Sequence, residues 1–112
     1  LSLSVSGSGK LRTAEVVTDE LDCSISGSGD IFMARGSSDR GDISISGSGS
    51  YNGPDFEIDD LEVRVSGSGN CLCKAGDSIR AAISGSGNVT YNGNPEKIDA
   101  RVSGSGHIRK AK

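Results

Sequence analysis

Apolar and polar residues alternate along six stretches of the chain, and each stretch ends in the tetrapeptide Ser-Gly-Ser-Gly. Side chains of an extended chain point to two faces in turn, so a period of two predicts strands with one buried face. The first stretch carries Leu1, Leu3 and Val5, and the same parity continues through both glycines to Leu11. Each copy is therefore expected to be an extended arm whose apolar residues and glycines point inward.

The tetrapeptide returns at a nearly constant spacing. Its first serine stands at positions 6, 26, 46, 66, 84 and 103. A regular period in this range is typical of a solenoid, and no stretch shows the i, i+3, i+4, i+7 pattern of a helix. Equivalent arms that stack on one another pair in parallel, and their crossovers are nearly always right-handed. The sequence thus predicts an all-β fold, a single-stranded right-handed parallel β-helix (solenoid) of about six coils with roughly 18–20 residues per coil.

Glycine suits a sharp bend around a narrow interior, because it has no side chain and tolerates unusual dihedral angles. We therefore predict that the tetrapeptide forms the corner of each coil. The structural corner glycines are Gly7, Gly9, Gly27, Gly29, Gly47, Gly49, Gly67, Gly69, Gly85, Gly87, Gly104 and Gly106. The intervening serines would stack into two outward columns and form a possible ligand-facing ladder: Ser6, Ser8, Ser26, Ser28, Ser46, Ser48, Ser66, Ser68, Ser84, Ser86, Ser103 and Ser105.

A second period, twice as long, lies beneath the first, because Asp19-Glu20-Leu21 matches Asp59-Asp60-Leu61 two repeats later. The segments between the arms differ between neighbouring coils. We expect alternate coils to return through a strand, with Val16 and Thr18 in one and Phe56 and Ile58 in the other. The turn-rich stretches ARGSSDRGD and KAGDSIRA predict that the coils between them return by loops.

Composition excludes several function classes. The net charge is -3 with acids and bases interspersed, and only four residues are aromatic, which gives no basic stripe or stacking platform for nucleic acid. No apolar run approaches the roughly 20 residues of a membrane span, and no signal peptide opens the chain. Leu1 already stands within the repeat pattern. We therefore expect residues 1–112 to be a single β-helix domain that forms a C-terminal portion or processed fragment of a longer protein.

The pattern [VI]-SGSG-x-[ILV], repeated once in each coil and followed by VTYNGNP and VSGSGHI, resembles the head GIN domain family of putative auto-transporter adhesins. The resemblance covers essentially the whole chain. It implies a β-helical bacterial protein that is secreted or associated with the cell envelope. It carries over no catalytic residue and no cofactor.

The residue pattern gives little support for a metal site. The position after each tetrapeptide holds Lys10, Asp30, Ser50, Asn70, Asn88 and His107, so only one coil supplies the acid of a calcium-binding β-roll. Cys71 and Cys73 form a Cys-x-Cys pair, and the single His107 is a distant third ligand candidate. All three cysteines, however, share the parity of the apolar columns. We expect buried free thiols, no disulfide framework and no bound metal.

Three short motifs are interpreted as structural. Arg40-Gly41-Asp42 matches a cell-attachment tripeptide, but we expect a turn that enters the next arm. The sequon Asn88-Val89-Thr90 is taken as a chance match. Tyr51-Asn52-Gly53 and Tyr91-Asn92-Gly93 predict left-handed turns, whose tyrosines pack inside more readily than they contact sugar.

The function expected from the sequence is that of a non-catalytic envelope or surface protein, an adhesin that binds glycan or protein through flat solenoid faces. A purely structural spacer or assembly module is the alternative, and a polysaccharide-cleaving β-helix enzyme is a third. His107 has no positioned nucleophile or acid nearby in the pattern, which argues against an enzyme. Neither terminus shows a capping helix. We therefore expect self-association or an upstream domain to cover the N-terminal coil.

Overall fold

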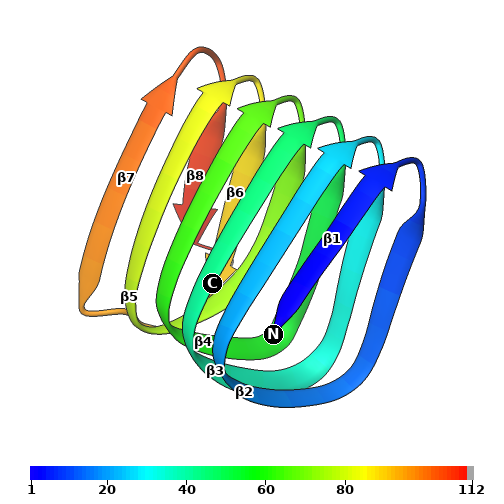
Figure 1. The fold of residues 1–112 in the computed structure, drawn as a ribbon. Helices are drawn as coiled ribbons and strands as arrows, with labels where there is room; N and C mark the ends of the chain where they lie inside the picture. The colour runs from blue at the N-terminus through cyan, green and yellow to red at the C-terminus, as the bar shows by residue number, and fades with distance from the viewer. Residues whose placement is uncertain (111–112) are drawn as a thin grey trace.

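The computed structural model of the protein describes residues 1–110, and its chain winds into a parallel β-solenoid of about 5 turns (Figure 1). The strands are β1 (Ser2–Gly7), β2 (Lys10–Gly27), β3 (Asp30–Gly47), β4 (Ser50–Gly67), β5 (Asn70–Gly85), β6 (Asn88–Asn92), β7 (Lys97–Ser103) and β8 (His107–Lys110). The predicted all-β solenoid is confirmed. The described residues contain no helix that is long and apolar enough to cross a membrane.

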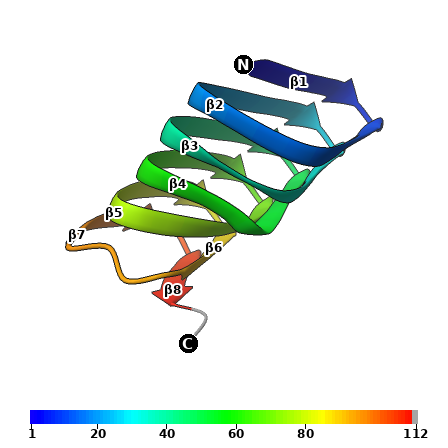
Figure 2. The same cartoon turned by 90° about the horizontal axis from the view of Figure 1, so that it is seen from below.

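Each coil has a front arm, a corner, a back arm and a lower bend. The front arms are β1, β7 and the second halves of β2 to β5; the back arms are β6, β8 and the first halves of β2 to β5 (Figure 1). The front arms run upward, the chain crosses to the back at the corner, and successive coils advance from β1 to β7, which makes the winding right-handed. Figure 2 shows β1 at one end of the stack and β7 and β8 at the other.

Strands pair in parallel with a register that repeats from coil to coil. The front arms stack in the order β1, β2, β3, β4, β5, β7, and the back arms end in β6 and β8. Val5 pairs with Ile25, and Ile25 pairs with Ile45. Because side chains on successive coils meet at the strand spacing of about 4.8 Å, each inward position becomes a continuous apolar column.

The inward columns form the core, as the parity of the sequence predicts. Leu21, Ile25, Ile45, Val65 and Ile83 are each at most 2% exposed. At the two ends of the stack, the apolar side chains of these columns are exposed to solvent. Leu1 is 51% exposed at the first coil, and Ile98 and Val102 are 52% and 43% exposed at the last.

The return segments differ from the prediction, because every lower bend from β2 to β5 remains within a strand. The expectation that alternate coils return by loops is wrong. What alternates is the volume of the inward side chains. Phe56 pairs with Gly36, and Ile58 pairs with Ser38. Ile58 also occupies the space in front of Gly41, where an added Cβ would lie 2.8 Å from two carbons of the Ile58 side chain. Large residues on one coil therefore fill the room left by small residues on its neighbours.

The Tyr51 hydroxyl is buried without a hydrogen-bond partner, and it is the one such side-chain atom among residues 1–110. Tyr51 itself is fully buried. An unpaired polar group in an apolar interior lowers stability by about 1–3 kcal/mol. We expect Tyr51→Phe to raise the free energy of unfolding by about 1 kcal/mol, measured by urea denaturation. Tyr91→Phe, at an 8% exposed tyrosine, serves as the control with little change. A less stable Tyr51→Phe variant would contradict this account.

Candidate functional site: the serine edge and the front face

The corner of the solenoid carries twelve serines in two columns, which we call the serine edge. The first column is set by strand register: Ser6, Ser26, Ser46, Ser66, Ser84 and Ser103 pair in succession. The second consists of Ser8, Ser28, Ser48, Ser68, Ser86 and Ser105 in the turns between strands. All twelve are exposed. The predicted stacking is confirmed, while a ligand-facing role stays a prediction.

Backbone hydrogen bonds between coils hold the serine edge in place. The Ser48 N–H donates to the Gly27 carbonyl at 3.0 Å, and the Ser50 N–H donates to the Gly29 carbonyl at 3.2 Å. Equivalent bonds recur at the other corners. Because the main chain satisfies its own polar groups, the hydroxyls are left free. The side-chain hydrogen bonds found within residues 1–110 include none from the serine edge.

The two glycines of each corner perform different tasks, which corrects the prediction that both point inward. Gly47 is exposed and has a φ of 105°, a left-handed conformation that favours glycine. Gly49 is buried, and a Cβ there would lie 2.3 Å from the Gly29 carbonyl oxygen and 2.4 Å from Ile25 Cγ2. The first glycine thus makes the turn, and the second lets neighbouring coils approach.

Beside the serine edge, the outward side of the front arms forms a flat surface that we call the front face. Its column nearest the first serines holds Ser4, Ser24, Ser44, Arg64, Ala82 and Arg101. The next column holds Ser2, Asp22, Asp42, Glu62, Arg80 and Asp99. The column nearest the serine edge therefore holds serine in the first three coils and changes to arginine, alanine and arginine in the last three.

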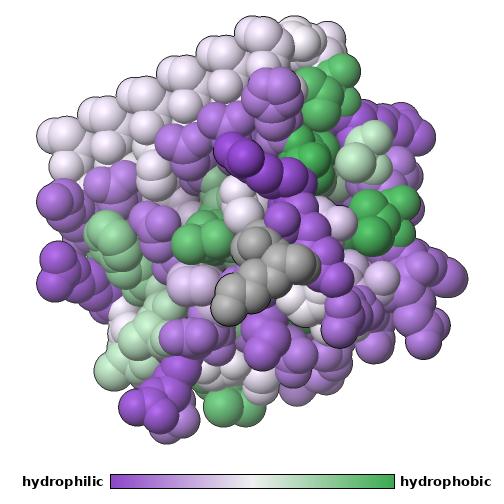
Figure 3. All heavy atoms as spheres, turned by 180° about the vertical axis from the view of Figure 1, so that it is seen from behind, coloured by the Kyte–Doolittle hydropathy of each residue, from purple (hydrophilic) through white to green (hydrophobic). Residues whose placement is uncertain are grey.

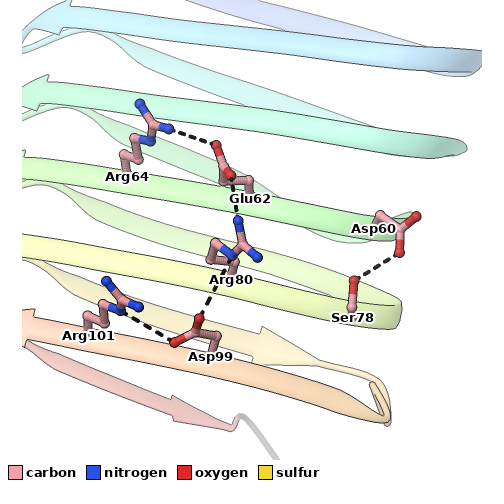
Figure 4. Close-up of polar contacts among 7 residues, drawn as sticks. All are labelled: Asp60, Glu62, Arg64, Ser78, Arg80, Asp99 and Arg101. Carbon is pink, nitrogen blue, oxygen red and sulfur yellow. Dashed lines mark hydrogen bonds and ion pairs between the residues drawn. The ribbon is translucent and has the colours of Figure 1, made fainter.

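A chain of ion pairs orders the arginine end of the front face (Figure 4). Glu62 lies 3.1 Å from Arg64 and 3.8 Å from Arg80, and Asp99 lies 3.9 Å from Arg80 and 3.6 Å from Arg101. The Arg64 and Arg101 side chains remain 69% and 82% exposed. Exposed pairs add little stability, so their main effect is to orient the guanidinium groups.

A shallow groove of about 470 Å³ lies between the two outer arginines. Its floor lies at Ala82, where the small side chain leaves a gap between Arg64 and Arg101. Ser66, Ser84 and Ser103 border it on the side of the serine edge. The groove is lined mainly by apolar atoms, and the serine hydroxyls and the guanidinium groups lie around its border.

The arginine groove was missed by the sequence analysis, although a signal for it exists. The residue two places before each first serine is Ser, Ser, Ser, Arg, Ala and Arg in successive coils. Parity places this residue on the same face as the serines. The tetrapeptide itself is identical in all six copies, so the change from serine to arginine lies outside it.

Acidic residues stack at the lower bend. Asp19, Asp39 and Asp59 occupy equivalent places on successive coils, between residues that pair in register. Partial burial and the negative charges of Asp77 and Glu57 raise the pKa of Asp59 above its usual 3.8. On the front face, partial desolvation of the exposed Asp42 and the charge of Glu62 likewise raise the pKa of Asp42. Like charges side by side on adjacent strands destabilise the fold.

These raised pKa values predict an unusual pH dependence. A carboxyl whose pKa is higher in the folded state binds its proton more tightly there, so protonation favours folding. The destabilisation is complete above the folded-state pKa and disappears as the pH falls through it toward 3.8. We expect urea midpoints to rise over this acidic range and Asp59→Asn to raise the midpoint at neutral pH. Asp55→Asn, at an exposed position outside the column, is the control; equal pH slopes for Asp59→Asn and wild type would contradict the explanation.

The column after the tetrapeptide lacks the acids of a calcium site. Lys10, Asp30, Ser50, Asn70, Asn88 and His107 do stack in register. Asn88 Nδ2 donates to Asn70 Oδ1 at 3.2 Å, which makes this a polar ladder with one carboxylate. No group of three or more potential metal ligands occurs within the part of the chain that the structure describes.

The cysteines lie in the core as free thiols, as predicted. Burial raises the pKa of Cys23 to about 12. A hydrogen bond with Cys73, together with burial, raises the pKa of Cys71. Both thiols therefore stay protonated at neutral pH and have little nucleophilic character.

The short motifs lie in strands more often than expected. Arg40-Gly41-Asp42 belongs to β3, with Gly41 buried and both charged residues exposed, so the predicted turn is wrong. Tyr51-Asn52-Gly53 also remains extended within β4, whereas Gly93 has a φ of 93° and forms the predicted turn. Both tyrosines pack in the core. The sequon asparagine Asn88 begins β6.

Comparisons with known proteins agree with this architecture. A family model described as "Putative auto-transporter adhesin, head GIN domain" matches residues 1–95. The chain is also similar to the crystal structure of a putative adhesin from Bacteroides fragilis, with a TM-score of 0.84 and 22% sequence identity. That alignment covers 97% of this chain and 59% of the other, so the chain spans less than two thirds of its structural relative. No curated protein matches the sequence.

Proposed function

The chain belongs to the family of putative auto-transporter adhesins with a head GIN domain, and from this premise we propose that it is a non-catalytic adhesin module that binds a glycan or a protein through its front face and serine edge. The family and the solved relative support an adhesin-like role at the cell surface or envelope. The ligand class is our own inference from the geometry.

The observation that carries the proposal is the free, regular array of donors. Twelve exposed hydroxyls repeat at the coil spacing of about 4.8 Å. Figure 3 shows the region as a pale stepped ridge along the upper left of the molecule. A rigid array of this kind can contact a repeating polymer at many equivalent points, and the order is already present before binding. The proposal includes no reaction step.

The test is a glycan array and a cell-surface binding assay with two sets of variants. Ser46→Ala, Ser66→Ala and Ser84→Ala together remove hydroxyls from the serine edge, and Arg64→Gln with Arg101→Gln removes the groove's charges. The matched controls are Ser37→Ala for the serines and Arg109→Gln for the arginines, both exposed and away from the front face.

We expect either set of front-face variants to weaken binding at least tenfold, equivalent to about 1.4 kcal/mol, and the controls to bind like wild type. Unchanged unfolding midpoints would show that the variants remain folded. If wild type binds no better than an unrelated β-helix, or if front-face and control variants bind equally, the proposal fails. The structural spacer would then be the better explanation.

A further inference from the structure

The two arginines that flank the groove at Ala82 keep unused hydrogen-bond donors. Arg64 reaches Glu62 through Nη2 at 3.1 Å, and Arg101 reaches Asp99 through Nε at 3.6 Å. A guanidinium group carries several further N–H donors. Within the part of the chain that the structure describes, the other nitrogens of Arg64 and Arg101 make no hydrogen bond or ion pair. Each guanidinium is therefore oriented by one acid and can still bind a further partner.

Positive charge gathers on the side of the front face that borders the serine edge. The column nearest the serine edge contains Arg64 and Arg101 and no acid, and the serine edge itself contains no charged residue. The acids Glu62 and Asp99 lie in the next column, on the far side of the arginines from the corner (Figure 4). An anion over the groove thus meets guanidinium groups and hydroxyls before it meets a carboxylate.

The groove joins these charges to an apolar floor. It has a volume of about 470 Å³, its lining is mainly apolar, and its floor lies at Ala82. Ala82 pairs with both Arg64 and Arg101, so the backbones of the two arginines are two strand spacings apart, about 9.6 Å. The first-column serines of the same three coils border the groove. Binding sites for small ligands commonly combine an apolar surface with a few placed polar groups.

We propose that the groove selects acidic glycans. Carboxylate or sulfate groups of the glycan bind to Arg64 and Arg101, the C–H face of a sugar ring lies on Ala82, and ring hydroxyls contact the serine edge. This inference rests on the proposed function, because it specifies the ligand of the same front face.

The donors at the groove favour an acidic sugar over other ligands. The planar guanidinium group matches an oxyanion through two parallel, charge-assisted hydrogen bonds. Serine hydroxyls both donate and accept, which complements the hydroxyls of a sugar, whereas an acidic peptide presents few hydroxyls. A neutral glycan would leave the free donors of Arg64 and Arg101 unused.

The experiment measures the affinity of the whole chain for soluble oligomers by isothermal titration calorimetry. The probes are an oligo-uronate, a sulfated oligosaccharide, a neutral oligosaccharide of the same length and oligoglutamate. The first two distinguish a carboxylate from a sulfate as the preferred group. Arg64→Gln and Arg101→Gln each remove one guanidinium, and Ala82→Glu places a carboxylate between the two arginines. Arg40→Gln is the matched control, because it removes the same charge from an exposed position on the outward side of the front arms, outside the groove.

We expect at least one acidic oligosaccharide to bind wild type at least tenfold more tightly than the neutral one, with a preference that weakens as salt rises. Each arginine variant should reduce this preference about tenfold, because it removes charge-assisted hydrogen bonds. Ala82→Glu should abolish the preference, and Arg40→Gln should keep it. Ala82→Glu should unfold at or above the wild-type midpoint, since opposite charges on adjacent strands attract, so its lost binding would not reflect lost folding.

Equal affinity for acidic and neutral oligosaccharides would overturn this proposal, and so would oligoglutamate that binds as tightly as the better acidic sugar. An equal loss of preference in Arg40→Gln and in the groove variants would also overturn it, because the preference would then reflect overall charge. In these cases the proposed function still stands if the serine-edge variants weaken binding. If wild type binds no glycan and no cell surface, both proposals fail.

Discussion

Gly49→Val is expected to prevent the chain from reaching its native fold. Gly49 lies in the middle of the stack, where an added Cβ would be 2.3 Å from the Gly29 carbonyl oxygen and 2.4 Å from Ile25 Cγ2. The carbonyl belongs to the backbone and cannot rotate away, and Ile25 is only 1% exposed. Neighbouring coils would have to separate, which breaks the pairing of β2 with β3. We expect a loss of about 4 kcal/mol or more, the range of the most damaging single substitutions.

Gly9→Val supplies a matched control for this prediction. The residue type, the tetrapeptide and the position within it are the same, but the nearest atom to the added Cβ is 3.9 Å away. This variant should therefore unfold at the wild-type midpoint. Circular dichroism and urea titration of both proteins measure the difference. Equal destabilisation of the two would show that the cost lies in the local conformation of the corner and not in the approach of coils.

Phe56→Ala is expected to lower the free energy of unfolding by about 4 kcal/mol. The Phe56 ring is fully buried and stands beside Gly36, which has no side chain to move into the vacated space. Removal of the ring therefore leaves a cavity that its surroundings cannot fill, and cavities add to the lost transfer energy.

Val17→Ala is the control for Phe56→Ala, because Val17 is 77% exposed at the same lower bend. We expect a change of about 0.5 kcal/mol or less for this exposed site. Urea denaturation monitored by circular dichroism gives both values. A loss below about 1.5 kcal/mol for Phe56→Ala would mean that the lower bend collapses around the missing ring.

The arms and corners of this fold could be predicted from the sequence because they depend on parity and spacing. A period of two places Ile25, Ile45 and Val65 on one face whatever lies around them. Six tetrapeptides at nearly equal steps then leave few ways to stack the arms. The serine columns follow from the same two facts, and the structure places them as expected.

The lower bend could not be predicted in this way, because its conformation is decided by neighbouring coils. Residues 34–42 read as a turn-rich loop when taken alone, yet they extend along β2 and receive Phe56 and Ile58 from β4. Asn52 and Gly53 similarly favour a turn but continue β4. In these segments the pairing partner overrides local preference. The arginine groove could have been predicted, because Arg64 and Arg101 stand two residues before the first serine of their tetrapeptides. The period of two places both on the face that carries these serines.

The large Phe56 and Ile58 pack against small residues of the neighbouring coil, Gly36, Ser38 and Gly41. This fit determines how many coils the fold can gain or lose at one time in evolution. Loss of a single coil would keep every corner in register but would bring unsuited bends together, large against large or small against small. Gain or loss of two neighbouring coils would preserve the alternation. Duplication in blocks of two coils is therefore the step that leaves the interior filled, and the match between Asp19-Glu20-Leu21 and Asp59-Asp60-Leu61 is the trace such a step would leave.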